Sequence, residues 1–280
     1  MLNRTKLHKF IREPPFRLFF KALYGVLPVS LETRALWDNC SHPYPQYLNG
    51  VLLAAQQAVQ QKVDEIAVVE FGVAGGNGLM ALQEEAAAVE RETGVRIKVF
   101  GFDNGPNGLP TFIGDHRDHP DAWQPGDYAM DEAKLRARLA PRTTLILGNV
   151  RDTVPAFVNQ GLAPPIGFMA IDLDLYSSTV QALNILSLPS AKMLHRVFIY
   201  FDDIELTICH RYAGELLAID EFNRTNEKIK IDRLRGFNSN RPFPEKQYLK
   251  MMYVAHDLQA ISMIGANRTG HKPIMTHSLR

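Results

Sequence analysis

Short apolar runs alternate with amphipathic segments along most of the chain. Five runs of mainly apolar residues are typical of buried parallel strands, and they lie at 66–71, 97–102, 144–147, 167–171 and 197–201. Apolar residues recur at helical spacing in four other segments, at 79–91, 154–160, 179–188 and 212–223. Because strand and helix alternate, the pattern predicts parallel β-α-β units and a doubly wound α/β sheet.

The end of this pattern differs from the rest. Two strand-like runs at 229–234 and 248–255 are joined without room for a crossover helix. We therefore expect them to form an antiparallel pair at one edge of the sheet. The predicted fold is a Rossmann-like, doubly wound sheet that is mostly parallel, with an antiparallel C-terminal edge pair and an N-terminal helical segment.

An apolar stripe near the N-terminus predicts a further helix that ends before Pro28. Its members repeat at helical spacing and are Phe16, Phe19, Phe20, Leu23 and Leu27. Because this stripe must be buried against another surface, we expect residues 1–45 to form a helical lid or dimer arm over the edge of the sheet where ligands bind. Residues 46–256 then form the main domain, and 257–280 form a C-terminal tail.

Composition narrows the class of protein. The chain has 280 residues, of which 46% are hydrophobic and 22% are charged, as in an ordinary globular enzyme. A net charge of +1 offers no whole-molecule attraction to nucleic acid. Two cysteines suit a reducing cytoplasm. The longest apolar stretch, 18–29, contains Lys21 and is shorter than the roughly 20 residues of a spanning helix, so no stable membrane insertion is expected.

Acidic residues follow two of the predicted strands. Asp172 and Asp174 come directly after one strand, and Asp202 and Asp203 come directly after the next. Because parallel strands end at one edge of the sheet, these carboxylates should converge there. Neither acidic segment contains a lysine or arginine that could neutralise them. Such a cluster repels itself unless a cation or a proton intervenes, which favours a magnesium or manganese site. Asp172 or Asp174 can instead cap the helix near Ser177, and the Asp202 pair can be solvated charge.

A glycine-rich turn follows the first strand. It lacks both the G-x-G-x-x-G spacing of dinucleotide sites and a Walker sequence. Instead, an acidic residue is followed by small residues at every second position, namely Glu70, Gly72, Ala74, Gly76 and Gly78. This resembles the first motif of class I S-adenosylmethionine-dependent methyltransferases, in which glycine is the commoner residue at the position of Ala74. Asp103 ends the second strand, where a carboxylate can accept both ribose hydroxyls.

The resemblance extends over roughly residues 65–225. The motifs FDNGPNGLP, GNVRDTVP and DLDLYSST, followed by Asp202 and Asp203, are similar in order and spacing to the macrocin and mycinamicin O-methyltransferases and their aminocoumarin relatives. Those enzymes methylate sugar hydroxyls with a magnesium ion. Departures such as Leu173, where glycine is usual, and Ile204, where tyrosine is frequent, concern the acceptor side.

The resemblance implies a role for each matching residue. It makes Asp172, Asp202 and Asp203 the metal ligands. Cofactor contacts are expected from Glu70, Gly72, Ala74, Gly76, Asp103, Asn149, Val150 and Tyr47. The general base would be Asp172, or else a histidine of the loop between the second and third strands, His116 or His119. A polar loop without catalytic function explains these histidines equally well, and core packing explains Tyr47.

These features together predict transfer of a methyl group from S-adenosylmethionine to a hydroxyl of a small molecule, a sugar or a glycosylated natural product, with help from a divalent metal. The enzyme is expected to be a cytoplasmic homodimer without a nucleic-acid partner. Two alternatives stay open. One is a metal-dependent catechol or phenol O-methyltransferase, and the other is a non-catalytic domain that kept the cofactor loop.

Overall fold

The computed structural model describes residue 22 and residues 29–37, 44–161, 163–189, 192–239 and 241–266. The apolar stripe predicted between residues 16 and 27 lies outside the described residues, as does most of the predicted tail. The proposed lid or dimer arm therefore stays a prediction.

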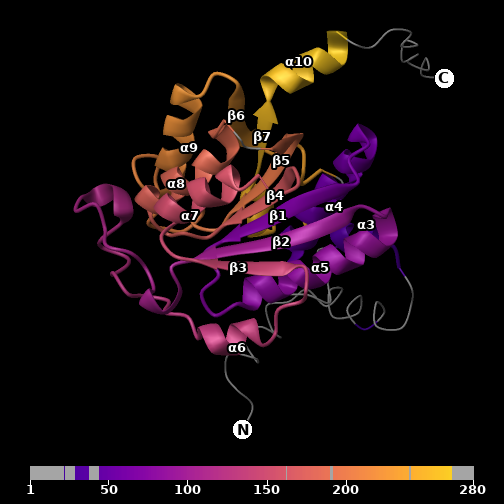
Figure 1. Ribbon diagram of the computed structural model, residues 1–280. Coiled ribbons are helices and arrows are strands. Elements are labelled where there is room, and N and C mark those ends of the chain that lie inside the picture. The colour runs from indigo at the N-terminus through magenta and orange to yellow at the C-terminus, as the bar shows by residue number, and fades with distance from the viewer. Residues whose placement is uncertain are drawn as a thin grey trace, which may run out of the picture.

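A seven-stranded sheet forms the centre of the molecule, with strand order β3-β2-β1-β4-β5-β7-β6 (Figure 1). β7 runs antiparallel to both of its neighbours, and the other neighbouring strands are parallel. This confirms the predicted fold class. The strands are β1 Glu65–Phe71, β2 Arg96–Asp103, β3 Thr143–Leu147, β4 Ile166–Ile171, β5 Met193–Phe201, β6 Ile229–Arg233 and β7 Met252–Asp257.

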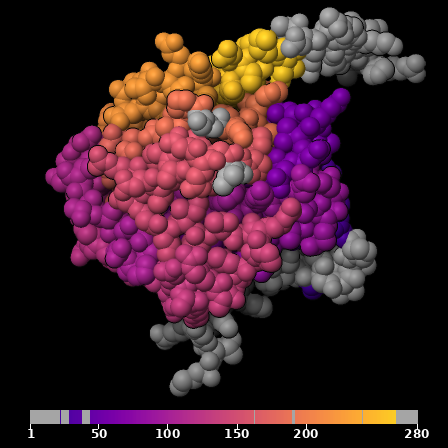
Figure 2. All heavy atoms as spheres, viewed as in Figure 1, coloured from indigo at the N-terminus to yellow at the C-terminus, as the bar shows by residue number. Residues whose placement is uncertain are grey.

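Helices cover both faces of the sheet (Figure 1). One face carries α3 Leu31–Leu36, α4 Pro45–Gln61 and α5 Asn77–Thr93, and the other carries α7 Val150–Asn159, α8 Tyr176–Ser187 and α9 Gly214–Thr225. Figure 2 shows the closely packed side chains of α7 and α8 from the same side. The shorter elements are η1 Gly105–Asn107, η2 His116–Asp118, α6 Glu132–Arg136, η3 Gln247–Lys250 and α10 Leu258–Ala266.

Strand register brings the ends of four strands to one edge. Phe71 of β1 pairs with Phe102 of β2 and with Ile171 of β4, and Ile171 pairs in turn with Phe201 of β5. All four residues are buried between the helical layers, which explains why these strands read as continuous apolar runs. The polar residues that follow them must therefore lie side by side at the carboxyl edge, where ligands bind in open α/β sheets.

The described part of the N-terminal segment packs on the outside of α4 and α5. The backbone N–H of Leu31 donates to Glu92 Oε2 at 3.2 Å, and Asn49 Nδ2 donates to the carbonyl of Ala35 at 3.2 Å. α3, the described helix of the predicted arm, therefore packs against α4 and α5 of the main domain. Within the described ranges, each helix is too short or too polar to cross a membrane.

Candidate active site

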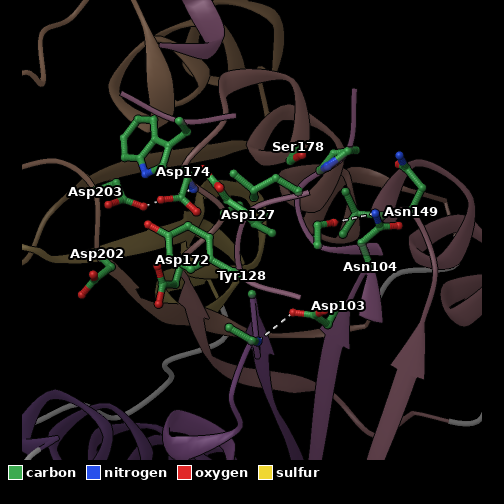
Figure 3. Close-up of a pocket in the computed structure, with 18 of the residues that line it drawn as sticks. Asp103, Asn104, Asp127, Tyr128, Asn149, Asp172, Asp174, Ser178, Asp202 and Asp203 are labelled. Atoms are coloured by element: carbon green, nitrogen blue, oxygen red, sulfur yellow. Dashed lines mark hydrogen bonds between the residues drawn. The ribbon is translucent and has the colours of Figure 1, made fainter. Parts of the chain in front are cut away.

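A cavity of about 440 Å³ opens at the carboxyl edge of the sheet (Figure 3). The glycine loop and the ends of β2 and β3 line one part of it, with Gly72, Ala74, Asp103, Asn149 and Val150. The ends of β4 and β5 line another part, with Asp172, Leu173, Asp174, Asp202 and Asp203. Residues from both predicted groups, those for the cofactor and those for the metal, thus line one cavity.

The glycine loop lies directly against the carboxylate motif. Gly72 has a φ of +84°, and a Cβ added there would come within 1.6 Å of the carbonyl oxygen of Asp172. Only glycine allows both this conformation and this close approach. The loop between β1 and α5 and the turn after β4 are therefore in contact through their backbones.

Ala74 has a strained backbone. Its φ of +44° lies in the left-handed region that favours glycine, the residue that is commoner at this point of the motif. Because glycine removes the steric cost, we expect Ala74→Gly to raise the free energy of unfolding by about 1 kcal/mol, measured by urea denaturation. In contrast, Ala133→Gly in the exposed first turns of α6 should lower it by up to about 1 kcal/mol. An equal loss in both variants would contradict the strain argument.

Asp103 holds the glycine loop to the end of β2. Its Oδ2 accepts hydrogen bonds from the backbone N–H groups of Val73 and Ala74, both at 2.8 Å. Its Oδ1 accepts from the N–H of Gly105 at 2.6 Å. Asp103 also lines the cavity, and Oδ1 keeps one lone pair that a ligand can use. The sequence predicted that Asp103 binds the cofactor, but it did not predict the hydrogen bonds between Asp103 and the glycine loop.

Glu70 and Tyr47 lie behind the glycine loop, and neither is among the residues that line the cavity. The hydroxyl of Tyr47 donates to Glu70 Oε1 at 2.6 Å, and a Cβ on Gly78 would come within 2.0 Å of the same oxygen. Burial raises the pKa of Glu70 to about 8. The other oxygen, Oε2, has no hydrogen-bond partner among the described residues.

The raised pKa of Glu70 predicts a pH-dependent stability. The folded state favours the protonated form, so this contribution is fully present below the ordinary pKa of 4.5 and is lost as the pH rises to about 8. Compared with Glu70→Gln, the parent should lose stability over this range by about 1.4 kcal/mol per pH unit at most. Urea denaturation of both proteins between pH 5 and 8 measures the two free energies of unfolding. Their difference at each pH isolates Glu70, because the other titratable groups are the same in both proteins. Parallel curves would contradict this prediction.

Three aspartates meet at the other end of the cavity. One carboxylate oxygen from each of Asp172, Asp174 and Asp203 lies within 4.8 Å of the others. Burial and the neighbouring carboxylates raise the pKa of Asp172 well above its usual range, that of Asp174 to about 8 and that of Asp203 to about 7. Asp202 lines the same cavity, but its Oδ1 accepts a hydrogen bond from Tyr200. The donor set therefore fits a hard divalent cation, and the cluster contains Asp174 where the sequence resemblance implied Asp202.

Backbone hydrogen bonds position this cluster. The N–H of Asp174 donates to Asp203 Oδ2 at 3.1 Å, and the N–H of Asp203 donates to Glu215 Oε2 at 3.1 Å. Glu215 is fully buried, and burial raises its pKa well above the usual range. The sequence did not indicate Glu215, because a glutamate in the first turn of a helix is common without any function.

The two predicted histidines differ in their burial. His116 is exposed, whereas His119 is buried against Trp123 and His210, with ring centroids 5.6 and 5.3 Å apart. Burial, followed by the charge of His210, lowers the pKa of His119. Neither predicted histidine is among the residues that line the cavity.

Asp118 joins the loop between β2 and β3 to the start of α8. It is fully buried, and its Oδ1 and Oδ2 accept from the N–H and the hydroxyl of Ser177 at 2.8 and 2.9 Å. α8 itself has no side-chain cap from its preceding residue, Leu175. Asp118 thus accepts a hydrogen bond from an otherwise unpaired N–H group in the first turn of α8. The sequence offered this capping role to Asp172 or Asp174 as an alternative to metal binding.

The same loop forms a wall of the cavity. The N–H of Leu109 donates to the carbonyl of Asp127 at 2.8 Å, and the N–H of Gly126 donates back to Leu109 at 2.9 Å. Trp123 and Tyr128 from this wall line the cavity, and Tyr128 lies beside Asp174 (Figure 3). Sequence reasoning did not place these aromatic residues at the site, because no local pattern marks them.

Comparison with solved structures identifies related folds. The calicheamicin methyltransferase CalS11 matches with a TM-score of 0.50 and 19% identity, over 88% of this chain and 94% of that chain. The O-methyltransferase NovP matches with a TM-score of 0.47 and 20% identity, over 63% and 70%. An O-methyltransferase from Bacillus cereus in complex with SAH matches with a TM-score of 0.42 and 15% identity, over 85% and 87%. No protein-family model and no curated protein sequence matches this chain.

The protein therefore has the Rossmann-like methyltransferase fold. The match to the methyltransferase CalS11 covers 88% of this chain and 94% of that chain, and it shows that the two proteins share this fold. At 19% identity, this match defines the architecture and leaves the reaction to be argued from the cavity.

Proposed function

We propose that the protein transfers a methyl group from S-adenosylmethionine to a hydroxyl of a small molecule, a sugar or a glycosylated natural product. The observation that carries this proposal is the single cavity that joins the glycine loop to the aspartate cluster. Methyl transfer to oxygen is an in-line displacement, which requires the acceptor oxygen, the methyl carbon and the sulfur to be aligned. A cofactor at the loop end and an acceptor at the carboxylate end would be neighbours in this cavity.

The cofactor end has the features that such a ligand needs. Gly72 and Ala74 line the cavity, and Asp103 keeps one lone pair on Oδ1 that can accept from a ribose hydroxyl. Asn149 and Val150 line the cavity after β3, where the resemblance places the adenine. Glu70, Gly76 and Tyr47 act from behind, by holding the loop.

At the acceptor end, we propose that Asp172 and Asp203 hold a divalent cation together with a third aspartate. When bound, a magnesium or manganese ion would supply Lewis-acid chemistry that makes a hydroxyl more acidic. Asp172 is the proposed general base, since it lies between the glycine loop and the other aspartates. We further propose a cytoplasmic homodimer, with residues 1–45 as a helical lid or dimer arm.

Calorimetry with S-adenosylhomocysteine tests the cofactor assignment. We expect binding by the parent protein, and weaker binding by Asp103→Asn, because an amide lowers the negative charge that accepts the loop N–H groups and the ribose hydroxyls. Failure of the parent to bind S-adenosylhomocysteine, or tight binding of NAD in its place, would exclude the proposed function.

A pair of matched variants tests which aspartate completes the metal site. From the distances, Asp174→Asn should weaken Mn²⁺ binding by about tenfold or more, whereas Asp202→Asn removes the same charge outside the nearest cluster and should have a smaller effect. Titration of Mn²⁺ followed by electron paramagnetic resonance measures both. A larger loss in Asp202→Asn would restore the ligand set that the sequence resemblance implies. Full transfer activity in excess chelator would remove the metal from the proposal.

A phenolic acceptor is the second candidate, because Trp123 and Tyr128 supply an aromatic wall that such a ring could stack on. Assays with catechol and with simple glycosides, each with labelled S-adenosylmethionine, separate the two. Methylation of catechol alone would favour the phenolic acceptor over the sugar.

A further inference from the structure

The cavity lining is strongly acidic. Six aspartates line it, and no lysine, arginine or histidine of the described residues does so. Asp103 lies at the cofactor end, whereas the others surround the acceptor end and are Asp127, Asp172, Asp174, Asp202 and Asp203. The methyl donor has one net positive charge and a divalent ion has two, so their binding leaves several carboxylates without a counter-charge. An acceptor with a phosphate would be repelled there.

Asp174 needs a ligand with a donor or a positive charge, and the divalent cation proposed above supplies it. Asp174 is 8% exposed, and among the described parts of the chain its carboxylate accepts no hydrogen bond and forms no ion pair. A buried carboxylate in this state is costly unless a ligand provides a donor or a positive charge. Asp174 also has a φ of +59°, an uncommon backbone conformation of the kind that persists where surrounding structure enforces it.

Asp127 faces the same part of the cavity from the opposite wall. Its Oδ2 accepts from the N–H of Gln124 at 2.9 Å, and no described side chain pairs with its Oδ1. The neighbouring Tyr128 lines the same cavity and lies beside Asp174 (Figure 3). The two walls thus present carboxylates next to an aromatic ring, which is the combination that binds organic ammonium groups.

We propose that the acceptor carries a protonated amine close to the hydroxyl that is methylated, as in an amino sugar, and that Asp127 and the ring of Tyr128 bind this amine. The inference rests on the proposed function, because it concerns the acceptor of the same reaction. It also predicts that a sugar phosphate binds more weakly in this cavity than the neutral sugar.

Binding to the protein loaded with S-adenosylhomocysteine and Mg²⁺ tests the proposal. The probes are methyl glucoside, its analogues with an amine in place of the hydroxyl at carbon 2, 3 or 4, and its 6-phosphate, all measured by calorimetry and by methyl transfer from labelled cofactor. We expect at least one amine to bind about fivefold more tightly than the neutral glycoside, and the phosphate to bind more weakly than either.

Three outcomes would overturn the inference. They are a phosphate that binds as well as the neutral glycoside, amines that bind no better than it, and binding of no glycoside at all. In each case, retained binding of S-adenosylhomocysteine leaves the proposed function standing, whereas loss of that binding would remove the proposed function first.

Asp127→Asn tests the residue directly. An asparagine oxygen can still accept from Gln124, so the wall should stay in place while the charge is removed. We expect the affinity for the preferred amine to fall about fivefold, with the affinity for the neutral glycoside unchanged. Asp121→Asn is the matched control, since Asp121 is exposed in the same loop and does not line the cavity. Unchanged selectivity in Asp127→Asn would refute the assignment to this residue.

Discussion

Asp172→Asn should reduce methyl transfer by about a thousandfold while leaving the binding of S-adenosylhomocysteine close to that of the parent. Asp172 is the aspartate that contacts both halves of the cavity. Its backbone carbonyl touches Gly72, and its carboxylate meets those of Asp174 and Asp203. The substitution keeps the size of the side chain and the backbone contact, and it removes the negative charge that would serve as base and ligand.

Single-turnover assays and calorimetry on the same preparation separate these two effects. Asp220→Asn, on the exposed face of α9, serves as the control and should match the parent in both. Because burial and like charges already raise the pKa of Asp172, the variant should be at least as stable as the parent without metal. If activity survives, Asp172 is not the base. If cofactor binding is lost together with activity, the role of Asp172 is to position the glycine loop.

Gly72→Ala should abolish cofactor binding and destabilise the protein by at least about 3 kcal/mol. The added Cβ would lie 1.6 Å from the carbonyl oxygen of Asp172. The φ of Gly72, +84°, is also unfavourable for alanine. Because the obstacle is backbone, no side-chain rotation relieves it. Either the glycine loop or the turn after β4 has to move, and both line the cavity.

Gly75→Ala provides a matched control in the same loop, since an added Cβ there meets nothing within 4 Å. We expect this variant to retain binding of S-adenosylhomocysteine and to change the free energy of unfolding by less than about 1 kcal/mol. Urea denaturation and calorimetry measure both quantities. A Gly72→Ala protein with the stability and affinity of the parent would show that the contact with Asp172 does not position the loop.

Local pattern predicted most of the architecture. Runs such as 66–71 and 167–171 are mainly apolar because helices cover both faces of a parallel strand. The fold class of the protein could therefore be predicted from the sequence alone. The convergence of Asp172 with Asp203 was also predictable, because parallel strands end at one edge of the sheet. The pairing of the last two strands was predicted, but not that β7 lies between β5 and β6.

Only the tertiary structure showed what surrounds these carboxylates. Asp118 bonds to Ser177 across 59 positions of sequence, and Glu215 lies beneath Asp203 from the start of another helix. Trp123 and Tyr128 reach the cavity because a long loop folds back onto its own first residues. Periodicity reports which face of an element is buried, whereas these contacts depend on how distant segments meet. The sequence by itself therefore determined the sheet and the edge where its carboxylates gather, and the packing of loop and helix ends decided their partners.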